Sequence, residues 1–478
     1  MDYDYDLCVI GAGSAGLTLA NGAVRLGLKT VLIEKNKMGG DCLNYGCVPS
    51  KTLIKSSKIY DYFKNGSKYG NPSFEVPKAD GKAIMNNVHQ AISEIAPKDS
   101  EERYEKLGVE VIRDTACFED KHTIKTNNSG QLTAKYIAVT SGSKPKTIEL
   151  KGLKEIGYLT NENIFELEKL PASMIFIGGG PIGVELSMAF ARFGVEITII
   201  AKHSNILHMI DQEAVKILKQ EMKRLNIKIL YNNSLIEAYR DNSKKVIKVA
   251  NNKEEIKEII ADEVVVAVGR YPDIENLQLK KAGVDYTKNG IKVNKKMQTS
   301  VKNIYAAGDA TGDYKFTHMA GYEASIALRN IVFKLPAKAD YSAVPWVLYS
   351  EPEIASVGLS EKDLKSKGIQ YKILKSDFKD NDRAVAERRK EGFVKLLINK
   401  HDKILGAVIV GKSAGELLPL INYFIVNKIK LRKILNVIFP YPTLSEILKE
   451  TVSSYYSDKI FNKTVRKILR FLFNYQGN

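Results

Sequence analysis

Apolar positions near the start of the chain form two short runs separated by a helical pattern. An unbroken apolar run at Leu7–Ile10 predicts a buried strand, and a helical pattern follows over Leu17–Leu26. A second apolar run at Thr30–Ile33 predicts another strand, which leads into the acidic Glu34. A strand, a helix and a strand in this order predict a parallel βαβ unit.

The same order recurs in the middle of the chain. Met174–Ile177 predicts a strand, Val184–Phe193 a helix and Glu196–Ile200 a second strand. Residues 264–269 lead out of this second unit, and residues 299–309 return to the first. The second fold is therefore expected to be inserted into the first.

The last third of the chain changes character after Pro345, where glycine-turned strands and a long helical region predict a separate α+β domain. The expected fold class is α/β, with two Rossmann-like folds, one inserted in the other, followed by this domain. The boundaries that we expect are 1–152 and 274–340 for the two parts of the first fold, 153–273 for the inserted fold, 341–456 for the α+β domain and 457–478 for a basic tail.

The turn after the first predicted strand is the glycine-rich segment Gly11-Ala12-Gly13-Ser14-Ala15-Gly16. In such a turn Gly11 permits the tight bend, Gly13 lets the backbone approach a pyrophosphate, and Gly16 lets the helix pack on the strand. The start of the helix then faces the phosphates. Glu34 lies about 20 residues further on, where its carboxylate can accept a ribose hydroxyl. The segment predicts a dinucleotide site.

A second glycine turn, Gly178-Gly179-Gly180-Pro181-Ile182-Gly183, opens the inserted fold. Ala201 stands where an acid would bind the ribose, and Lys202 and His203 follow it. A cation at this place favours a 2′-phosphate, so we expect NADPH rather than NADH. The residues expected at this second site are Gly178, Gly180, Ile182, Gly183, Glu185, Lys202, His203 and Gly269.

Composition is close to that of an ordinary globular protein, with 44% hydrophobic and 27% charged residues in 478. The net charge is +17, but the lysines are spread along the chain and no nucleic-acid-binding motif is present, so no nucleic acid is expected as a partner. The sequence contains no apolar run of 18 residues, so we expect no membrane-spanning helix. Its acidic start does not have the pattern of a secretory signal. We expect a cytoplasmic protein.

Two of the four cysteines, Cys42 and Cys47, lie close together just after the first βαβ unit. A zinc site would need a second pair, and Cys8 and Cys117 are isolated, so no metal site is expected. A structural disulfide is improbable in a reducing compartment. A redox-active pair remains, and such pairs work when a helix start or a cation stabilises the thiolate.

Over nearly its whole length the sequence resembles the flavin-dependent pyridine nucleotide–disulfide oxidoreductases, among them dihydrolipoyl dehydrogenase, glutathione reductase and mercuric reductase. The cysteine segment, both glycine turns, Gly269-Arg270-Tyr271-Pro272 and Ala306-Ala307-Gly308-Asp309 match in order. The resemblance implies a homodimer in which the α+β domain forms the interface. It implies FAD contacts at Gly11, Gly13, Ser14, Ala15, Gly16, Glu34, Gly40, Lys51, Gly142, Gly308, Asp309 and His318.

The resemblance also implies the roles of the redox residues. Cys47 would lie against the flavin as the charge-transfer thiolate, and Cys42 would be the thiol that meets the substrate. Lys51 would lie by the flavin and pair with Glu185. Electrons would pass from NADPH to FAD, then to the Cys42–Cys47 disulfide and on to an acceptor.

The C-terminal segment departs from the disulfide-reducing members, which carry a His-Pro-Thr sequence with a glutamate five residues after the histidine. Here Tyr441 takes the place of the histidine, and Glu446 the place of the glutamate. A tyrosine is a poor general base near neutral pH. Tyr441, like Pro181, resembles the mercuric reductase branch, although no cysteine pair is present near the C-terminus. The resemblance implies that Tyr441 and Glu446 face Cys42 of the partner subunit.

Three functions are compatible with these features. The first is an FAD-dependent NAD(P)H reductase of a metal ion, a quinone-like acceptor or an unusual disulfide. The second is a dihydrolipoyl dehydrogenase-type enzyme with a divergent base, and the third is a membrane-docked redox sensor or binding flavoprotein.

The tail beyond Tyr456 combines apolar and basic residues at helical spacing. Phe461, Val465, Ile468 and Leu472 fall on one face, and Lys459, Lys463, Arg466 and Arg470 fall on the opposite face. A basic amphipathic helix of this kind can lie on an anionic membrane. The alternative is that its apolar face packs on the body of the protein or on a dimer mate.

Overall fold

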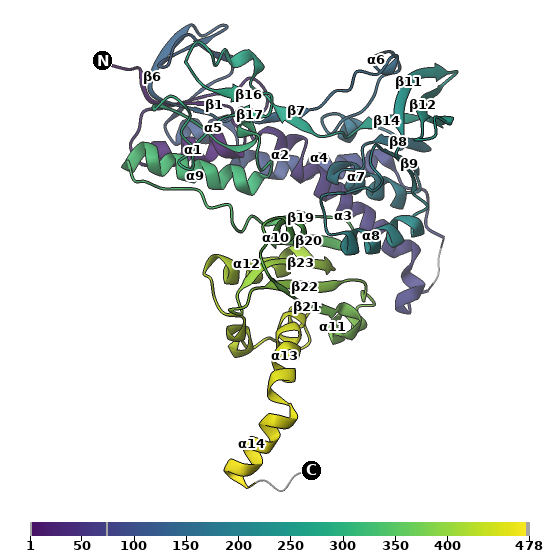
Figure 1. Cartoon of the computed structure of the whole chain (residues 1–478). Coiled ribbons are helices and arrows are strands. Elements are labelled where there is room, and N and C mark those ends of the chain that lie inside the picture. The colour runs from purple at the N-terminus through teal and green to yellow at the C-terminus, as the bar shows by residue number, and fades with distance from the viewer. Residues whose placement is uncertain (1, 73–74, 475–478) are drawn as a thin grey trace. The chain divides into compact units, whose positions relative to one another are not determined.

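A computed structural model describes residues 2–72 and 75–474, which form two compact units (Figure 1). The first unit comprises the described residues up to Leu207 together with Leu225–Asp340. The second comprises His208–Arg224 and the described residues from Tyr341 onward.

The first unit is built on a sheet whose parallel strands follow the order β3-β2-β1-β6, with β18 pairing with β6. Strands β5 and β4 extend the sheet in antiparallel fashion beyond β6. Helices α1 and α9 lie side by side in this unit (Figure 1). The bounds are β1 Tyr5–Ile10, β2 Thr30–Ile33, β3 Val109–Ile112, β4 Ala116–Phe118, β5 Thr123–Thr126, β6 Gln131–Val139, β18 Ile304–Ala306, α1 Ser14–Arg25 and α9 Thr317–Phe333.

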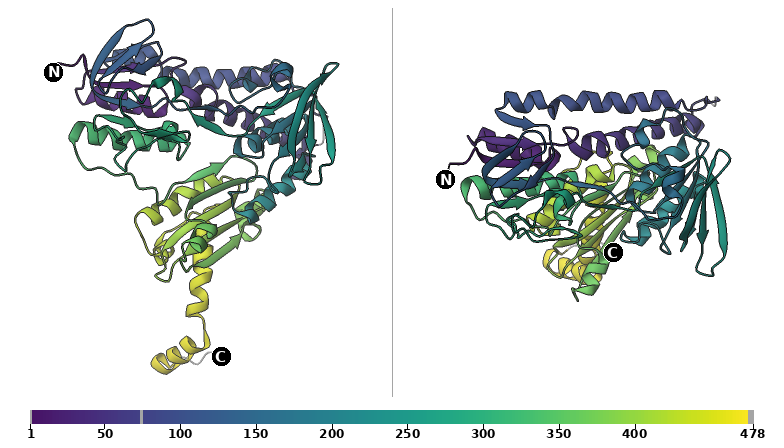
Figure 2. Two further views of the ribbon diagram at one scale, coloured as in Figure 1. Left: turned by 45° about the horizontal axis from the view of Figure 1, so that its top comes forward. Right: turned by 90° about the horizontal axis from the view of Figure 1, so that it is seen from above.

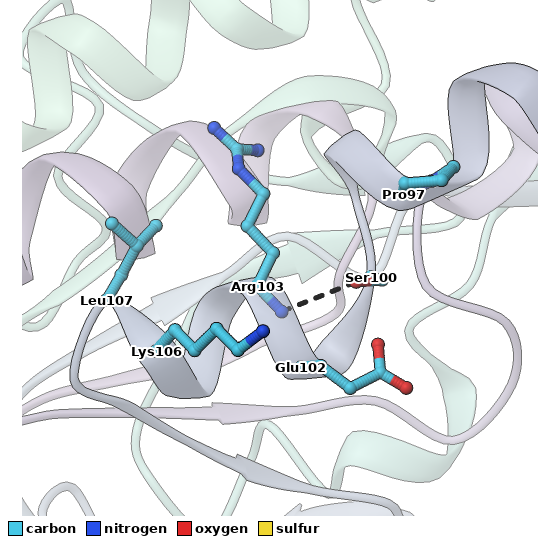
Figure 3. Close-up of a pocket in the computed structure, with 6 residues that line it drawn as sticks. All are labelled: Pro97, Ser100, Glu102, Arg103, Lys106 and Leu107. Atoms are coloured by element: carbon cyan, nitrogen blue, oxygen red, sulfur yellow. Dashed lines mark hydrogen bonds between the residues drawn. The ribbon is translucent and has the colours of Figure 1, made fainter.

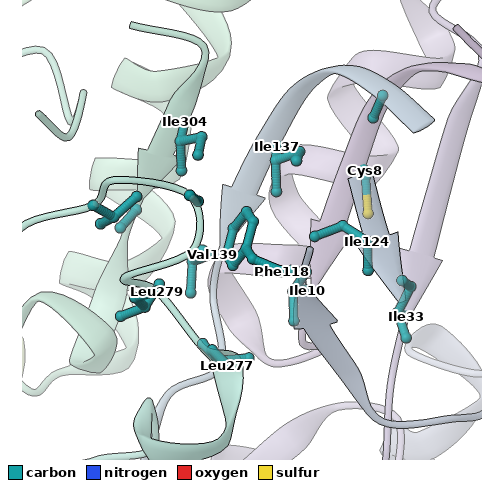
Figure 4. Packing of buried hydrophobic residues seen from close by; sticks show 14 of the residues in the cluster. Cys8, Ile10, Ile33, Phe118, Ile124, Ile137, Val139, Leu277, Leu279 and Ile304 are labelled. Atoms are coloured by element: carbon teal, nitrogen blue, oxygen red, sulfur yellow. The ribbon is translucent and has the colours of Figure 1, made fainter. Parts of the chain in front are cut away.

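Buried side chains of this sheet pack against the chain that returns from the inserted fold (Figure 4). Cys8, Ile10 and Ile137 from the strands lie in one cluster with Leu277 and Leu279. Two distant stretches of sequence therefore share one core, as expected of a fold that is interrupted by another.

The inserted fold has its own parallel sheet, in the order β10-β9-β8-β14, and a three-stranded antiparallel sheet, β11-β12-β13. Its entry and exit strands, β7 and β15, pair with each other in antiparallel fashion. The bounds are β7 Ser143–Pro145, β8 Ser173–Ile177, α7 Pro181–Arg192, β9 Glu196–Ala201, β10 Lys228–Tyr231, β11 Ser234–Asp241, β12 Lys244–Ala250, β13 Ile256–Ala261, β14 Glu263–Val266 and β15 Arg270–Pro272. This architecture confirms the predicted fold class.

Both dinucleotide-fold helices begin three residues before their predicted starts. Helix α1 begins at Ser14 rather than Leu17, and α7 begins at Pro181 rather than Val184. The last glycine of each motif, Gly16 or Gly183, therefore lies inside the first turn of its helix. Pro181 suits the first position of a helix because the missing N–H would have no partner within the helix there.

Two long helices of the first unit, α3 (Cys47–Lys64) and α4 (Gly81–Ile95), lie side by side (Figure 2). Helix α3 also packs against α7 of the inserted fold. The remaining bounds in this unit are α2 Gly40–Asn44, α5 Glu101–Lys106, α6 Leu153–Ile156, β16 Tyr286–Thr287 and β17 Gly290–Ile291.

The second unit contains a five-stranded antiparallel sheet in the order β19-β20-β23-β22-β21. Side chains of α12 and α13 join the apolar cluster of this sheet. The bounds are α8 Gln212–Arg224, β19 Trp346–Leu348, β20 Glu353–Gly358, α10 Glu361–Ser366, β21 Lys372–Asp377, α11 Asp382–Ala386, β22 Phe393–Ile398, β23 Ile404–Gly411, α12 Ala414–Val426, α13 Glu446–Ile460 and α14 Lys463–Phe473.

The tail does not form the single continuous helix that its apolar and basic spacing predicts. Helix α13 ends at Ile460, and Asn462 then caps α14 by accepting a hydrogen bond from the N–H of Val465 at 3.0 Å. Asn462 has extended backbone angles, so the helix is interrupted. Lys459 and Phe461 therefore precede α14, while the other six residues of the two faces lie on it. Residues 475–478 of the tail lie outside the described residues.

Candidate functional site

Three helices of the first unit begin close to Thr317. The hydroxyl of Ser14, the first residue of α1, donates to the carbonyl of Thr317, the first residue of α9, at 3.2 Å. The sulfur of Cys47, the first residue of α3, lies 3.3 Å from the Thr317 hydroxyl. Because the N-terminus of a helix carries partial positive charge, this convergence favours anions: phosphates at α1 and a thiolate at Cys47.

Cys42 and Cys47 form one hydrogen-bonded pair and are free thiols in the structure. The hydrogen bond from Cys42 lowers the pKa of Cys47 to about 6, and the Thr317 hydroxyl and the charge of Lys51 act in the same direction. The shared hydrogen bond and burial raise the pKa of Cys42 well above its usual range. The two sulfurs are thus different: the surroundings of Cys47 favour its thiolate, and those of Cys42 favour its protonated thiol.

Lys51 lies one turn after Cys47 on α3 and donates to Glu185 on α7 at 2.8 Å. The Glu185 side chain is 8% exposed, so the pair is half-buried. A cation one turn from the start of α3 stabilises the Cys47 thiolate. The structure thus joins the redox segment of the first fold to the first turns of the inserted fold.

The first glycine turn combines dense packing with open space. A Cβ atom at Gly16 would lie 1.8 Å from the carbonyl oxygen of Gly11, and one at Gly11 would lie 2.5 Å from that of Thr140. A Cβ at Gly13 would meet nothing within 4 Å. The backbone at Gly13, the cap of α1, therefore faces room that suits the pyrophosphate of FAD.

The carboxylate of Glu34 lies beside this turn. It accepts hydrogen bonds from the N–H groups of Ala12 and Asn36, each at 2.6 Å. Two backbone donors hold this side chain in place, and each of its oxygens keeps a lone pair for a ribose hydroxyl. Gly40, the first residue of α2, closes the same region, since a Cβ there would lie 2.7 Å from Cα of Gly13.

Gly308 and Asp309 follow β18, where the first fold resumes. The N–H of Gly308 donates to the buried carboxylate of Glu323 at 2.8 Å. Asp309 accepts from the Ser143 hydroxyl at 2.5 Å, and burial raises its pKa. Gly142, next to Ser143, lies between β6 and β7, so these predicted flavin contacts come together at one end of the sheet.

Arg270 is a part of the site that the sequence reasoning missed. Its Nη2 donates to Asp41 Oδ1 at 2.9 Å and to the carbonyl of Ser143 at 2.8 Å, and its Nε donates to the Ser143 hydroxyl at 2.8 Å. Its Nη1 donates to Asn161 at 3.2 Å. The guanidinium thus links Asp41, beside Cys42, to Ser143, which binds Asp309. Its position directly after Gly269, in a segment that matches the family, could have indicated that Arg270 belongs to the site.

His318 is the second residue of α9, next to Thr317. Its ring stacks on that of Phe316, with 5.2 Å between centroids and 9° between planes. The resemblance implies that the backbone near His318 contacts the flavin. Thr317, the residue before it, contacts Cys47, so this backbone lies close to the redox pair.

The second glycine turn repeats the geometry of the first. A Cβ at Gly178 would lie 2.4 Å from the carbonyl oxygen of Ala267, and one at Gly183 would lie 2.3 Å from that of Gly178. Gly180 caps α7 and a Cβ there would meet nothing within 4 Å. Ile182 is exposed on the first turn of α7. This turn therefore has room for a second pyrophosphate.

Lys202 and His203 directly follow β9, and both are exposed. They leave the sheet at the carboxyl end of β9, beside the strand that carries Gly178 at its own end. Gly269 accepts from the N–H of Lys146 at 2.9 Å, between β14 and β15. These residues share the edge at which dinucleotides bind in such folds.

Tyr441 and Glu446 belong to the second unit. The Tyr441 hydroxyl donates to Asp382 at 3.0 Å, and this hydrogen bond raises the pKa of Tyr441 above its usual value. Glu446 accepts instead from the N–H of Thr443 at 3.3 Å. Within one subunit, Glu446 thus bonds to the backbone of Thr443, and Tyr441 bonds to Asp382.

A surface depression at α5 is lined by none of the residues described above (Figure 3). It is lined by Pro97, Ser100, Glu102, Arg103, Lys106 and Leu107. Among residues 2–72 and 75–474, no group of three or more histidine, cysteine or acidic side chains is arranged to hold a metal ion. No helix in the same part of the chain is both long and apolar enough to cross a membrane.

Fold and site together define an oxidoreductase with two dinucleotide folds and a dithiol. The sequence profile of the pyridine nucleotide-disulphide oxidoreductases matches residues 5–324, and that of their dimerisation domain matches residues 344–452. The chain belongs to this family, whose members use FAD and a pyridine nucleotide. The match to the dimerisation domain indicates a homodimer.

Similar proteins include enzymes named mercuric reductase and enzymes named dihydrolipoyl dehydrogenase. Mercuric reductase from Staphylococcus aureus is 31% identical over 94% of this chain and 82% of its own. Dihydrolipoyl dehydrogenase from Geobacillus stearothermophilus is 34% identical over 92% of this chain and 94% of its own. A solved structure with the same fold is the Cu(II) complex of the HOCl-induced flavoprotein disulfide reductase RclA from Escherichia coli, with a TM-score of 0.83 and 22% identity over 93% of this chain and 98% of that one.

Proposed function

We propose that this protein is an FAD-dependent NADPH oxidoreductase that passes an electron pair through the Cys42–Cys47 disulfide to a metal ion, a quinone-like acceptor or an unusual disulfide. The observation that carries the proposal is the asymmetry of the two sulfurs. The pKa of Cys47 is about 6 and that of Cys42 is raised. A pair of this kind has one sulfur suited to face an electron donor and one suited to face a substrate.

FAD, when bound, supplies a ring that accepts a hydride from reduced nicotinamide and passes on two electrons. Reduction of the Cys42–Cys47 disulfide by two electrons would break its S–S bond. Cys42 takes one proton and becomes a thiol, while Cys47 remains a thiolate, stabilised by Thr317, Lys51 and the start of α3. Glu185 holds Lys51 in place for this role.

The preference for NADPH rests on the end of β9. Ala201 provides no carboxylate to bind a ribose 2′-hydroxyl or repel a 2′-phosphate, and Lys202 and His203 are exposed next to it. Electrostatic attraction by Lys202 favours the phosphorylated cofactor.

The choice of acceptor rests on Tyr441. The hydrogen bond to Asp382 raises its pKa further above neutrality, so it is a poor proton acceptor in thiol exchange. Acceptors that take electrons with little proton transfer tolerate a tyrosine in place of the histidine. One of the similar proteins, at 31% identity, is named mercuric reductase.

A dihydrolipoyl dehydrogenase-type activity is the second candidate, since a relative of that name is 34% identical to this chain. In either case we propose that Tyr441 and Glu446 of one subunit face Cys42 of the other in the homodimer. We also propose that the enzyme works in the cytoplasm, where reducing conditions keep a dithiol available.

An acceptor panel with the purified, FAD-loaded dimer tests this function. NADPH oxidation is measured with Hg²⁺, Cu²⁺, lipoamide, oxidised glutathione and quinones, each with wild type and Cys42→Ser. We expect turnover with a metal ion or a quinone and a loss of at least about tenfold in Cys42→Ser. Lipoamide turnover at usual enzyme rates would favour the second candidate instead.

A further inference from the structure

Helix α14 lies outside the parts of the chain that the family accounts for. The match to the dimerisation domain ends at residue 452, and α14 spans Lys463–Phe473. None of its residues is buried. The redox residues and the dinucleotide folds therefore do not explain this helix.

The side chains of α14 are separated by type. Val465, Ile468 and Leu472 follow one another along one face, and Ile468 and Leu472 are 50% and 62% exposed. Phe471 and Phe473 add further exposed apolar surface. Lys463, Arg466 and Arg470 follow the same spacing on the opposite face.

The helix has local signals that fix where it begins and ends. Asn462 accepts a hydrogen bond from Val465 at its start, and Asn474 takes a left-handed conformation at its end. An isolated helix of 11 residues is nevertheless marginal in water, since most helical stability comes from packing an apolar face. The sequence of α14 thus favours a helix that gains its stability on a surface.

The charge of α14 selects the kind of surface. Its four cations are Lys463, Arg466, Lys467 and Arg470, and no acidic residue lies within the helix. A second copy of the helix would carry the same charge, whereas a bilayer with anionic lipids offers phosphates to the cations and acyl chains to the apolar face. Charge complementarity therefore favours the membrane over self-association.

We propose that α14 docks this enzyme on an anionic membrane surface, with Ile468 and Leu472 toward the acyl chains and Arg466 and Arg470 at the lipid headgroups. This inference goes beyond the proposed reductase function and does not depend on it. Docking would hold the enzyme at the surface of the bilayer, without a spanning segment.

The test is sedimentation of the full-length, FAD-loaded protein with two kinds of vesicles. One kind is made of phosphatidylcholine alone, and the other also contains phosphatidylglycerol. We expect at least about tenfold stronger binding to the anionic vesicles, lost at high salt. Failure of the wild type to bind anionic vesicles would overturn the proposal.

Two variants separate the apolar and the electrostatic contributions. Ile468→Glu with Leu472→Glu, and the exchange of the four α14 cations for glutamine, should each reduce binding about tenfold or more. The matched control exchanges four exposed lysines of the first unit for glutamine: Lys253, Lys257, Lys288 and Lys292. It removes the same charge and should leave vesicle binding nearly unchanged.

Each alternative gives a different result. If the control and the α14 charge variant lose vesicle binding equally, the overall charge of the protein attracts it to the vesicles. That result would contradict docking by α14. If Ile468→Glu with Leu472→Glu changes the oligomeric state but not vesicle binding, then the apolar face packs on another copy and the proposal is wrong. FAD content and NADPH oxidation report that the variants are folded, because no redox residue lies on α14.

Discussion

The hydroxyl of Thr317 lies 3.3 Å from the sulfur of Cys47. This contact joins the start of α9 to the start of α3, and it lowers the pKa of Cys47. In the reduced enzyme the thiolate next to the flavin should give a long-wavelength absorbance band. Because the pKa of Cys47 is depressed to about 6, the band should be present above that pH and be lost as the pH falls through it.

Thr317→Val removes the hydroxyl and keeps the shape of the side chain. The pH midpoint of the band should rise by about one pH unit, which corresponds to the loss of one hydrogen bond to a charged group. Thr311→Val is the matched control, since that hydroxyl donates to the carbonyl of Gly308 and not to a sulfur. An unchanged midpoint in Thr317→Val would show that the hydroxyl does not stabilise the thiolate.

The Lys51–Glu185 pair should be needed as a pair. Lys51→Met removes the cation that pairs with Glu185, and Glu185→Gln removes the charge that holds Lys51. Each change should lower the free energy of unfolding by about 1–3 kcal/mol and slow reduction of the disulfide by NADPH. Chemical denaturation and stopped-flow spectroscopy measure the two effects.

The double variant Lys51→Met with Glu185→Gln is the informative comparison. Its stability should be higher than the sum of the single losses predicts, because neither charge is left unpaired. Its rate of disulfide reduction should stay low, since the cation near Cys47 is absent. Additive stability losses would mean that the two side chains do not interact.

Arg270 should couple the redox segment to the flavin site. Arg270→Met removes four hydrogen bonds, to Asp41, Asn161 and both the hydroxyl and the carbonyl of Ser143, from a half-buried network. We expect weaker FAD retention and a loss of about 1–3 kcal/mol in stability. Arg240→Met is the control, since Arg240 donates to the carbonyl of Ile156 at 2.8 Å, away from both glycine turns. Equal FAD loss in both variants would contradict a specific role.

Nicotinamide preference should respond to the end of β9. Ala201→Glu with Lys202→Ala introduces a carboxylate and removes a cation, and the ratio of kcat/KM for NADPH over NADH should fall about tenfold or more. Lys228→Ala is the control, because Lys228 lies on the neighbouring strand β10 and pairs with Glu196. A wild type that prefers NADH, or an unchanged ratio, would refute the assignment.

Local patterns predicted the two dinucleotide folds well. The turns at Gly11 and Gly178 depend on residues that are close in sequence, so their spacing was sufficient. The helix starts were missed by three residues because apolar periodicity begins only after the first turn, whereas Ser14 and Pro181 already have helical geometry. The break before α14 depends on the cap at Asn462, which the apolar pattern does not show.

The contacts around Arg270 could not be predicted from sequence in the same way. Asp41, Ser143, Asn161 and Arg270 come from four separate stretches of chain and meet only after the inserted fold has formed. Thr317 likewise reaches Cys47 across 270 positions of sequence. Such sites depend on tertiary structure, and a motif can indicate only one of their members.

The most direct test of the central claim is the absorbance of three FAD-loaded proteins before and after anaerobic addition of NADPH: wild type, Cys42→Ser and Cys47→Ser. If electrons reach an asymmetric sulfur pair, the long-wavelength band develops in the wild type when NADPH is added. In Cys42→Ser, which cannot form the disulfide, the Cys47 thiolate should give the band before NADPH is added. The band is absent in Cys47→Ser. A reduced spectrum of Cys47→Ser that matches the wild type would contradict the assignment of the two sulfurs and the function proposed from it.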